Sequence, residues 1–258
     1  MGKGIISHLK FKNSYEGFDH NKFAKLLEDA YVSTARDGKG TKKSTFSPST
    51  IGYGHGNCAR YWFIAFTGAD FDETKDAAAI ANMLNGTYAH DRIQKIMEKT
   101  GTVVALEHEV KNEDPPIRGF ADVIVEMDDE RVVGEIKTTK DEVFAIKQSS
   151  NNVSGNHLLQ ILTYMKILGI KNGFVLYENK NTQEILIIPV SMNERNEKVI
   201  NEVFDWLRSV RKLFDDGILP MRGFTKSNYA CKGCPVKDVC WKELGDGDVE
   251  IATLVPPK

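Results

Sequence analysis

Residues 119–137 constrain the fold of this chain more than any other stretch. Two runs of apolar, mostly β-branched residues flank a short polar tip, a pattern that predicts an antiparallel hairpin. A two-residue loop at Asp128-Asp129 places Asp122 directly opposite Glu135, roughly 4.5–5.5 Å apart. Lys137, two residues further, lies on the same face of its strand. Because two facing carboxylates repel each other, the hairpin predicts a cation between them.

The residues around this pair have the chemistry of a hydrolytic metal site. Mg²⁺ and Mn²⁺ prefer hard oxygen ligands, which Asp122, Glu135 and the backbone carbonyl of Ile136 supply. Lys137 is then placed to orient or deprotonate an attacking water, or to stabilise charge on a phosphate. An isolated acidic pattern of this kind is more often a solvated strand face. Here, apolar neighbours on both strands favour the metal site.

Composition bounds the remaining possibilities. With 258 residues and 41% hydrophobic content, the chain is long enough for one compact unit with a substantial core. The formal charge of −2 gives no global signature of nucleic-acid binding, so such binding has to depend on local patches. The sequence has neither a long apolar run nor a signal-peptide pattern, which predicts a cytoplasmic, reducing setting.

Hydrophobic periodicity predicts the elements that precede the hairpin. A helix is expected over 18–35 and a mobile loop over 37–43. A helix start is expected at 47–49, and the aromatic run 59–66 is expected to be a core helix. A helix over 76–99 and a strand over 102–112 come next. Inside the helix over 76–99, Gly86 suggests close approach by another group, since mid-helix glycine is unfavourable.

After the hairpin, residues 138–155 are predicted to be a loop or a short interrupted helix that orders on a ligand. A buried helix over 157–168 and a second hairpin formed by 173–178 and 184–190 follow. A capping box at 191–194 opens a long amphipathic helix. This order predicts an α/β fold with a mixed sheet.

Three polar residues on predicted helices are candidates for the same site. His90 precedes the sheet, and its imidazole suits Mn²⁺, although a lone helical histidine is more often structural. Gln160 and Tyr164 are four residues apart and share one face of the buried helix. Each either satisfies a hydrogen bond in the core or faces the site and holds a phosphate, a base or the water.

The four cysteines, Cys58, Cys231, Cys234 and Cys240, have the spacing of a metal centre. Three clustered thiolates and one distant thiolate favour a [4Fe–4S] cluster, whereas zinc sites usually combine two close pairs. Zinc remains the runner-up, and free thiols or disulfides are further alternatives. We call the arrangement that joins Cys58 to 231–240 the cysteine clasp. Beside it, Arg60 with the lysines Lys232, Lys237 and Lys242 suggests a basic rim for a phosphate backbone.

Taken in order, these motifs resemble RecB-like nucleases of the PD-(D/E)XK superfamily, specifically the four-cysteine branch. That branch includes CRISPR-adaptation exonucleases, their phage-encoded relatives and the nuclease domain of AddB. The resemblance covers about 46–242 and implies an α-β-β-β-α-β core with helical additions. It assigns metal binding to His90, Asp122, Glu135 and the Ile136 carbonyl. It makes Lys137 catalytic, identifies Gln160 and Tyr164 as the QxxxY pair, and gives the cysteines a [4Fe–4S] cluster.

The resemblance implies a metal-dependent DNA exonuclease that hydrolyses phosphodiester bonds with Mg²⁺ or Mn²⁺, on single strands or free ends. The expected pathway is recombination, repair or CRISPR-type adaptation, with a recombination or CRISPR-adaptation protein as a candidate partner. The expected location is the cytoplasm, that of the host if the protein is phage-encoded, and no membrane association is expected. Residues 1–45 are expected to be a helical and loop extension and 243–258 a tail. The alternatives are a non-cleaving DNA-end-binding subunit and a metal-clasped scaffold.

Overall fold

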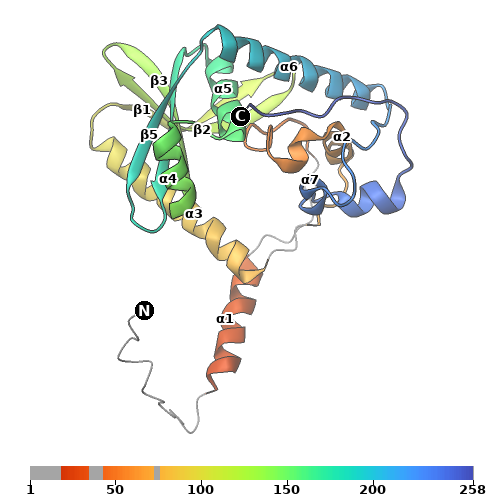
Figure 1. Ribbon diagram of the computed structural model, residues 1–258, viewed down its shortest axis with the longest axis horizontal. Coiled ribbons are helices and arrows are strands. Elements are labelled where there is room, and N and C mark those ends of the chain that lie inside the picture. The colour runs from red at the N-terminus through yellow and green to blue at the C-terminus, as the bar shows by residue number, and fades with distance from the viewer. Residues whose placement is uncertain (1–18, 35–42, 73–75, 258) are drawn as a thin grey trace.

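The computed structural model describes residues 19–34, 43–72 and 76–257. A five-stranded sheet with the order β1-β2-β3-β4-β5 lies on one side of the molecule (Figure 1). β3 and β4 are parallel, and the other neighbours are antiparallel. The mixed sheet with helices confirms the predicted α/β fold and fits the predicted core. The strands are β1 (Val103–Asn112), β2 (Ile117–Met127), β3 (Glu130–Thr139), β4 (Asn172–Asn179) and β5 (Ile185–Ser191).

The β2–β3 hairpin has the predicted loop and register. Met127 pairs with Glu130, and the ladder continues to Val123 and Gly134. The loop residues Asp128 and Asp129 have φ values of 52° and 62°. Positive φ at both central residues is the geometry of a type I′ turn, which matches the twist of the flanking strands. The prediction of a two-residue loop is therefore confirmed.

Helices cover both faces of the sheet. From α3 (Ala77–Glu98), Ile93 packs with Ile136 and Leu176. Because side chains alternate along a strand, Val133 and Val175 point to the opposite face. They belong to the main core together with residues of α5 (Gly155–Leu168). The catalytic candidates of β3 thus lie between two helical layers.

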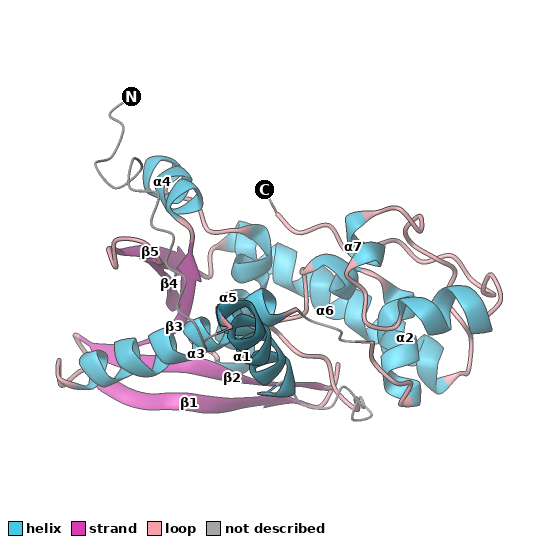
Figure 2. Cartoon of the chain, turned by 90° about the horizontal axis from the view of Figure 1, so that it is seen from below, coloured by secondary structure: helices cyan, strands magenta, loops and turns pink. Residues whose placement is uncertain are grey.

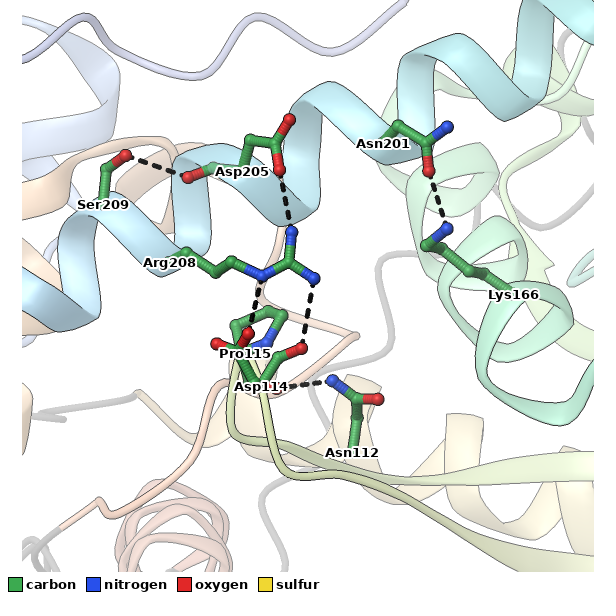
Figure 3. Close-up of polar contacts among 8 residues, drawn as sticks. All are labelled: Asn112, Asp114, Pro115, Lys166, Asn201, Asp205, Arg208 and Ser209. Atoms are coloured by element: carbon green, nitrogen blue, oxygen red, sulfur yellow. Dashed lines mark hydrogen bonds and ion pairs between the residues drawn. The ribbon is translucent and has the colours of Figure 1, made fainter.

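The long helix α6 (Glu194–Asp215) connects α5 to the loop between β1 and β2 (Figure 3). Lys166 of α5 donates to the side chain of Asn201 at 2.6 Å, and Arg208 Nε lies 2.9 Å from Asp114 Oδ2. These contacts are exposed and contribute little individually. The buried face of α6, with Ile200, Val203, Phe204, Leu207 and Val210, supplies most of its packing.

The cysteine-bearing segments lie beside the sheet (Figures 1 and 2). α2 contacts α6, and α7 contacts η2. The short elements of the cysteine-bearing segments are η2 (Gly54–Asn57), α2 (Ala59–Thr67), α7 (Tyr229–Lys232) and η3 (Val239–Glu243). The remaining described helices are α1 (His20–Thr34), which projects from the body in Figure 1, and α4 (Asp141–Ser150).

Three local predictions are corrected, and one choice between two alternatives is decided. The aromatic run 59–66 forms the predicted core helix, α2, but the predicted helix start at 47–49 is wrong, because the chain forms turns there. Of the two alternatives for 138–155, a loop or a short helix, the structure has a short helix over 141–150. The N-cap of α6 is Asn193, not a capping box led by Ser191. A Cβ on Gly86 would meet nothing within 4 Å, so none of the described residues approaches closely there.

The predicted loop at 37–42, and the parts of the N-terminal extension at 1–18 and 35–42, lie outside the described residues. None of the helices that the structure describes combines the length and apolar character that a membrane-spanning segment needs.

Candidate active site

Asp122 lies just beyond the last paired position of the β2–β3 ladder. Its Oδ2 accepts a hydrogen bond of 2.6 Å from the backbone N–H of Ile136. Nδ1 of His90, on α3, is 3.6 Å from the same oxygen. Two sequence-predicted candidates from different elements, His90 and Asp122, therefore meet beside the Ile136 backbone.

Glu135 is only 1% exposed, and its two carboxylate oxygens differ in environment. Oε1 accepts from Gln160 Nε2 at 2.7 Å and lies 2.5 Å from Lys137 Nζ. Oε2 is buried and has no hydrogen-bond partner among the described residues. A buried carboxylate oxygen without a hydrogen-bond partner is energetically unfavourable. Oε2 is therefore a candidate ligand atom for a cation.

Burial raises the pKa of both carboxyl groups. The pKa of Glu135 rises to about 8, first through desolvation and then through repulsion by Asp122, while Lys137 opposes the shift. Desolvation also raises the pKa of Asp122, against the lowering effects of His90 and the Ile136 N–H. At neutral pH the pair therefore favours sharing a proton unless a cation compensates both charges.

The QxxxY pair lies on the side of α5 that faces the sheet. Gln160 Nε2 bridges Glu135 and the hydroxyl oxygen of Tyr164, the latter at 3.3 Å. Desolvation, with a contribution from the charge of Glu135, raises the pKa of Tyr164. The phenol therefore stays protonated at neutral pH. The structure thus brings together six predicted candidates: His90, Asp122, Glu135, Lys137, Gln160 and Tyr164.

Two polar side chains at this site were not predicted. Gln94 Nε2, on α3, donates to Glu107 Oε1 at 2.6 Å and to the backbone oxygen of Asp122 at 2.9 Å. Glu107 has a φ of 46°, close to a bulge in β1. The positive φ of Glu107 and the nearby bulge interrupt the regular strand, and no spacing signal in the sequence identifies such irregularities.

The oxygen-rich donor set fits a hard divalent cation. Asp122, Glu135, His90 and the Ile136 carbonyl supply suitable atoms, and the orphaned Glu135 Oε2 gives a reason to bind one. Across 19–34, 43–72 and 76–257, no three His, Cys, Asp or Glu side chains already form a metal-ligand group. At this site, protein donors occupy one oxygen of each carboxylate.

All four cysteines line one small apolar cavity between α2, α7 and η3. Burial raises the pKa of Cys58 and Cys231, and that of Cys234 to about 12. Backbone N–H groups of Tyr61, Gly223 and Arg60 favour the thiolate of Cys58, but less strongly than burial opposes it. Four sulfurs at one cavity, with N–H donors directed at them, fit a metal centre that would keep them deprotonated.

Arg60 does not belong to the predicted basic rim, because it is completely buried. Its Nε is 3.2 Å from Cys240 Sγ, and its other nitrogens donate to the backbone oxygens of Pro220, Gly245 and Asp246. Arg60 therefore ties the C-terminal segment to α2.

Comparison with known proteins was consistent with this architecture. Residues 61–241 match the family described as the PD-(D/E)XK nuclease superfamily. No curated protein sequence gives a significant match.

The solved structures that are similar to the chain include the following three. The crystal structure of SSO0001 has 14% identity and a TM-score of 0.46, covering 90% of this chain and 100% of that chain. LHK-Exo, an alkaline exonuclease from Laribacter hongkongensis, has 13% identity and a TM-score of 0.48, with coverages of 73% and 95%. Its complex with dAMP has 12% identity and a TM-score of 0.49, with coverages of 75% and 93%. Since the family match spans most of the sequence, the chain belongs to the PD-(D/E)XK nuclease superfamily.

Proposed function

We propose that this protein is a divalent-metal-dependent DNA exonuclease that hydrolyses phosphodiester bonds on single strands or free ends. The observation that carries the proposal is the buried Asp122–Glu135 pair, with an unpartnered oxygen on Glu135 and the ammonium of Lys137 beside it. Family membership supports nuclease chemistry, and the acidic pair supports a requirement for a cation. The exonuclease mode and the DNA substrate follow from the sequence resemblance.

In this proposal, Asp122, Glu135, His90 and the Ile136 carbonyl hold Mg²⁺ or Mn²⁺. The cation, when bound, neutralises charge on the phosphate and lowers the pKa of water. Lys137 acts on the attacking water or on the charge that develops on the phosphate, exchanging its contact with Glu135 for one with the substrate. Gln160 keeps Glu135 oriented, and Tyr164 in turn contacts Gln160.

A cleavage assay tests the proposal. Single- and double-stranded DNA labelled at the 5′ or 3′ end is incubated with the protein and Mg²⁺, Mn²⁺ or EDTA. Stepwise shortening of labelled strands with a metal, and none in EDTA, is expected. Binding to DNA ends without cleavage under all conditions would support the end-binding alternative and overturn the nuclease assignment.

We also propose that the cysteine clasp holds a structural [4Fe–4S] cluster that joins 46–242 into one nuclease domain. The four cysteines at one cavity support a metal centre. The separation of Cys58 from the other three favours the cluster over zinc. Protein purified without oxygen is expected to be brown, to absorb near 400 nm and to contain about four iron and four sulfide ions per chain. A colourless protein that contains one zinc ion per chain would show that the four cysteines hold zinc and not a [4Fe–4S] cluster.

A further inference from the structure

A second polar group lies where β3 and β4 run side by side, next to the candidate active site. Lys137 and Tyr177 are register partners on these parallel strands, so their side chains share one face of the sheet. Above Tyr177, the Nζ atom of Lys147, on α4, is 4.5 Å from the centre of the phenol ring. The same Nζ donates to Ser154 Oγ at 2.7 Å.

His157 completes this group from the first turn of α5. Its Nδ1 is 2.9 Å from the hydroxyl oxygen of Tyr177, which also accepts from the backbone N–H of Ser154 at 3.2 Å. With that acceptor position used, the phenol proton is free to be donated to His157 Nδ1. In a neutral imidazole this leaves the proton on Nε2, which is then a hydrogen-bond donor.

The surroundings keep the imidazole of His157 neutral. Burial, together with the positive charges of Lys137 and Lys147, lowers its pKa to about 3. Among the residues that the structure describes, no carboxylate contributes to the pKa of His157 against this effect. The charges of two lysines therefore act on one neutral N–H donor.

The two lysines differ in whether a carboxylate balances their positive charge. Lys137 lies against Glu135, whereas Lys147 has no carboxylate within ion-pair distance in the part of the chain that the structure describes. Lys147 is only 6% exposed. A buried ammonium without a counter-charge is unfavourable, and its neighbourhood attracts an anion.

We propose that Lys147 and His157 form a binding site for a phosphate group of the nucleic acid, beside Lys137 and distinct from the phosphate that is hydrolysed. Ser154 and Tyr177 act as positioning residues, since each holds one of the two donors. The ligand is either a neighbouring backbone phosphodiester or a terminal phosphate. The inference rests on the proposed nuclease function and adds a second point at which the strand is held.

The variant Lys147→Met tests the site, because methionine preserves the apolar stem over Tyr177 and removes the charge. Its dissociation constant for a fluorescent single-stranded 12-mer in EDTA is expected to rise about tenfold, whereas the melting temperature stays unchanged or rises. A structural lysine would give the opposite pattern, namely a lower melting temperature with unchanged affinity. Lys166→Met, which removes a lysine on α5 that contacts α6, is the matched control.

His157 offers an independent test if Lys147→Met does not fold. His157→Leu removes the donor, whereas His157→Gln places an amide N–H near the position of Nε2. KM is expected to rise about tenfold in His157→Leu with a smaller change in kcat, and His157→Gln is expected to recover part of the loss. Wild-type affinity and KM in both Lys147→Met and His157→Leu would overturn the inference.

Substrate chemistry identifies the phosphate. Oligonucleotides with a 5′-phosphate, a 3′-phosphate or hydroxyls at both ends are compared with strands in which one internal phosphate is a neutral methylphosphonate. The modification that weakens wild-type binding but has no further effect on Lys147→Met marks the phosphate held there. If no modification behaves in this way, the phosphate site is refuted. A wild-type protein that cleaves no nucleic acid would instead refute the nuclease proposal, which the cleavage assay detects separately.

Discussion

The carboxylate of Asp122 caps the backbone of the neighbouring strand, with its Oδ2 atom 2.6 Å from the amide nitrogen of Ile136. This bond fixes the Asp122 side chain where the β2–β3 ladder ends, next to the peptide whose carbonyl we expect to bind the cation. The same residue therefore has a structural contact and a proposed catalytic one. Replacing the carboxylate with an amide separates the two, because asparagine still offers an oxygen to the Ile136 N–H.

We predict that Asp122→Asn and Lys137→Met each lower DNA cleavage by about 10²- to 10⁴-fold, the range typical for loss of an acid–base or charge-stabilising group. The melting temperature is expected to change little, because both replacements keep the size of the side chain. Cleavage rates with saturating Mn²⁺ and thermal melting provide the two measurements. Lys198→Met, at an exposed position of α6, controls for loss of one positive charge. Cleavage by either site variant at the rate of this control would contradict the proposed mechanism.

The raised pKa of Glu135 predicts a specific dependence of stability on pH. Between its ordinary value of 4.5 and its folded value of about 8, the folded protein retains a proton that the unfolded chain has released. Stability conferred by this proton is therefore full below pH 4.5 and is lost as pH rises to about 8. The contribution to the slope is at most about 1.4 kcal/mol per pH unit.

Urea unfolding between pH 5 and 9 in EDTA measures this effect, with Glu135→Gln as the comparison. The variant keeps the shape of the side chain and is expected to show a smaller loss of stability across the range. Mn²⁺ is expected to stabilise the wild type more at pH 8.5 than at pH 5, because the cation competes with the proton. Equal pH slopes in wild type and variant would show that Glu135 does not titrate in this way.

The sequence predicted the parts of the fold that depend on local patterns. Alternation and the short polar tip gave the hairpin with its register, and continuous apolar character gave α5 as a buried helix. Predictions failed or stayed open where tertiary packing decides. The polar 141–150 segment has no strong periodicity, so the sequence left a loop and a short helix open, and packing that buries Phe144 and Lys147 selects the helix α4. The residues at 47–49 have the composition of a helix start but form turns.

The site was predictable to the extent that its residues follow strand and helix periodicity. Glu135 and Lys137 share a face by alternation, and Gln160 and Tyr164 share a face by helical spacing. In contrast, the position of Glu107 depends on a positive φ beside a bulge, and Lys147 depends on where α4 packs. The burial of Arg60 could not be predicted from the sequence either, because arginine is usually exposed and the partners of Arg60 are more than 150 residues away in the chain.

The type I′ turn of the central hairpin provides a test of stability away from the proposed chemistry. Asp129 has a φ of 62°, a conformation that glycine adopts without strain and β-branched residues strongly disfavour. We expect Asp129→Gly to stabilise the fold by about 0.5 kcal/mol and Asp129→Val to destabilise it by about 1–2 kcal/mol. Urea unfolding of both variants is the measurement. The same stability in the two variants would contradict the importance of this turn for the register.

Arg60 links the stability of the fold to the cysteine clasp. Its guanidinium is completely buried and satisfies three backbone oxygens of the C-terminal segment in addition to contacting Cys240 Sγ. Arg60→Leu leaves these carbonyls without a partner, so we expect a loss of about 3 kcal/mol or more in the free energy of unfolding. Release of the segment that carries Cys240 is also expected to lower the iron and sulfide content.

Urea unfolding together with iron and sulfide analysis of anaerobically purified protein measures both effects. Arg195→Leu, on the first turn of α6, serves as the control and is expected to retain wild-type metal content. Arg60→Lys keeps a positive charge but offers donors from a single nitrogen, so it should recover only part of the stability. Full metal content and wild-type stability in Arg60→Leu would show that neither the clasp nor the C-terminal segment depends on this arginine.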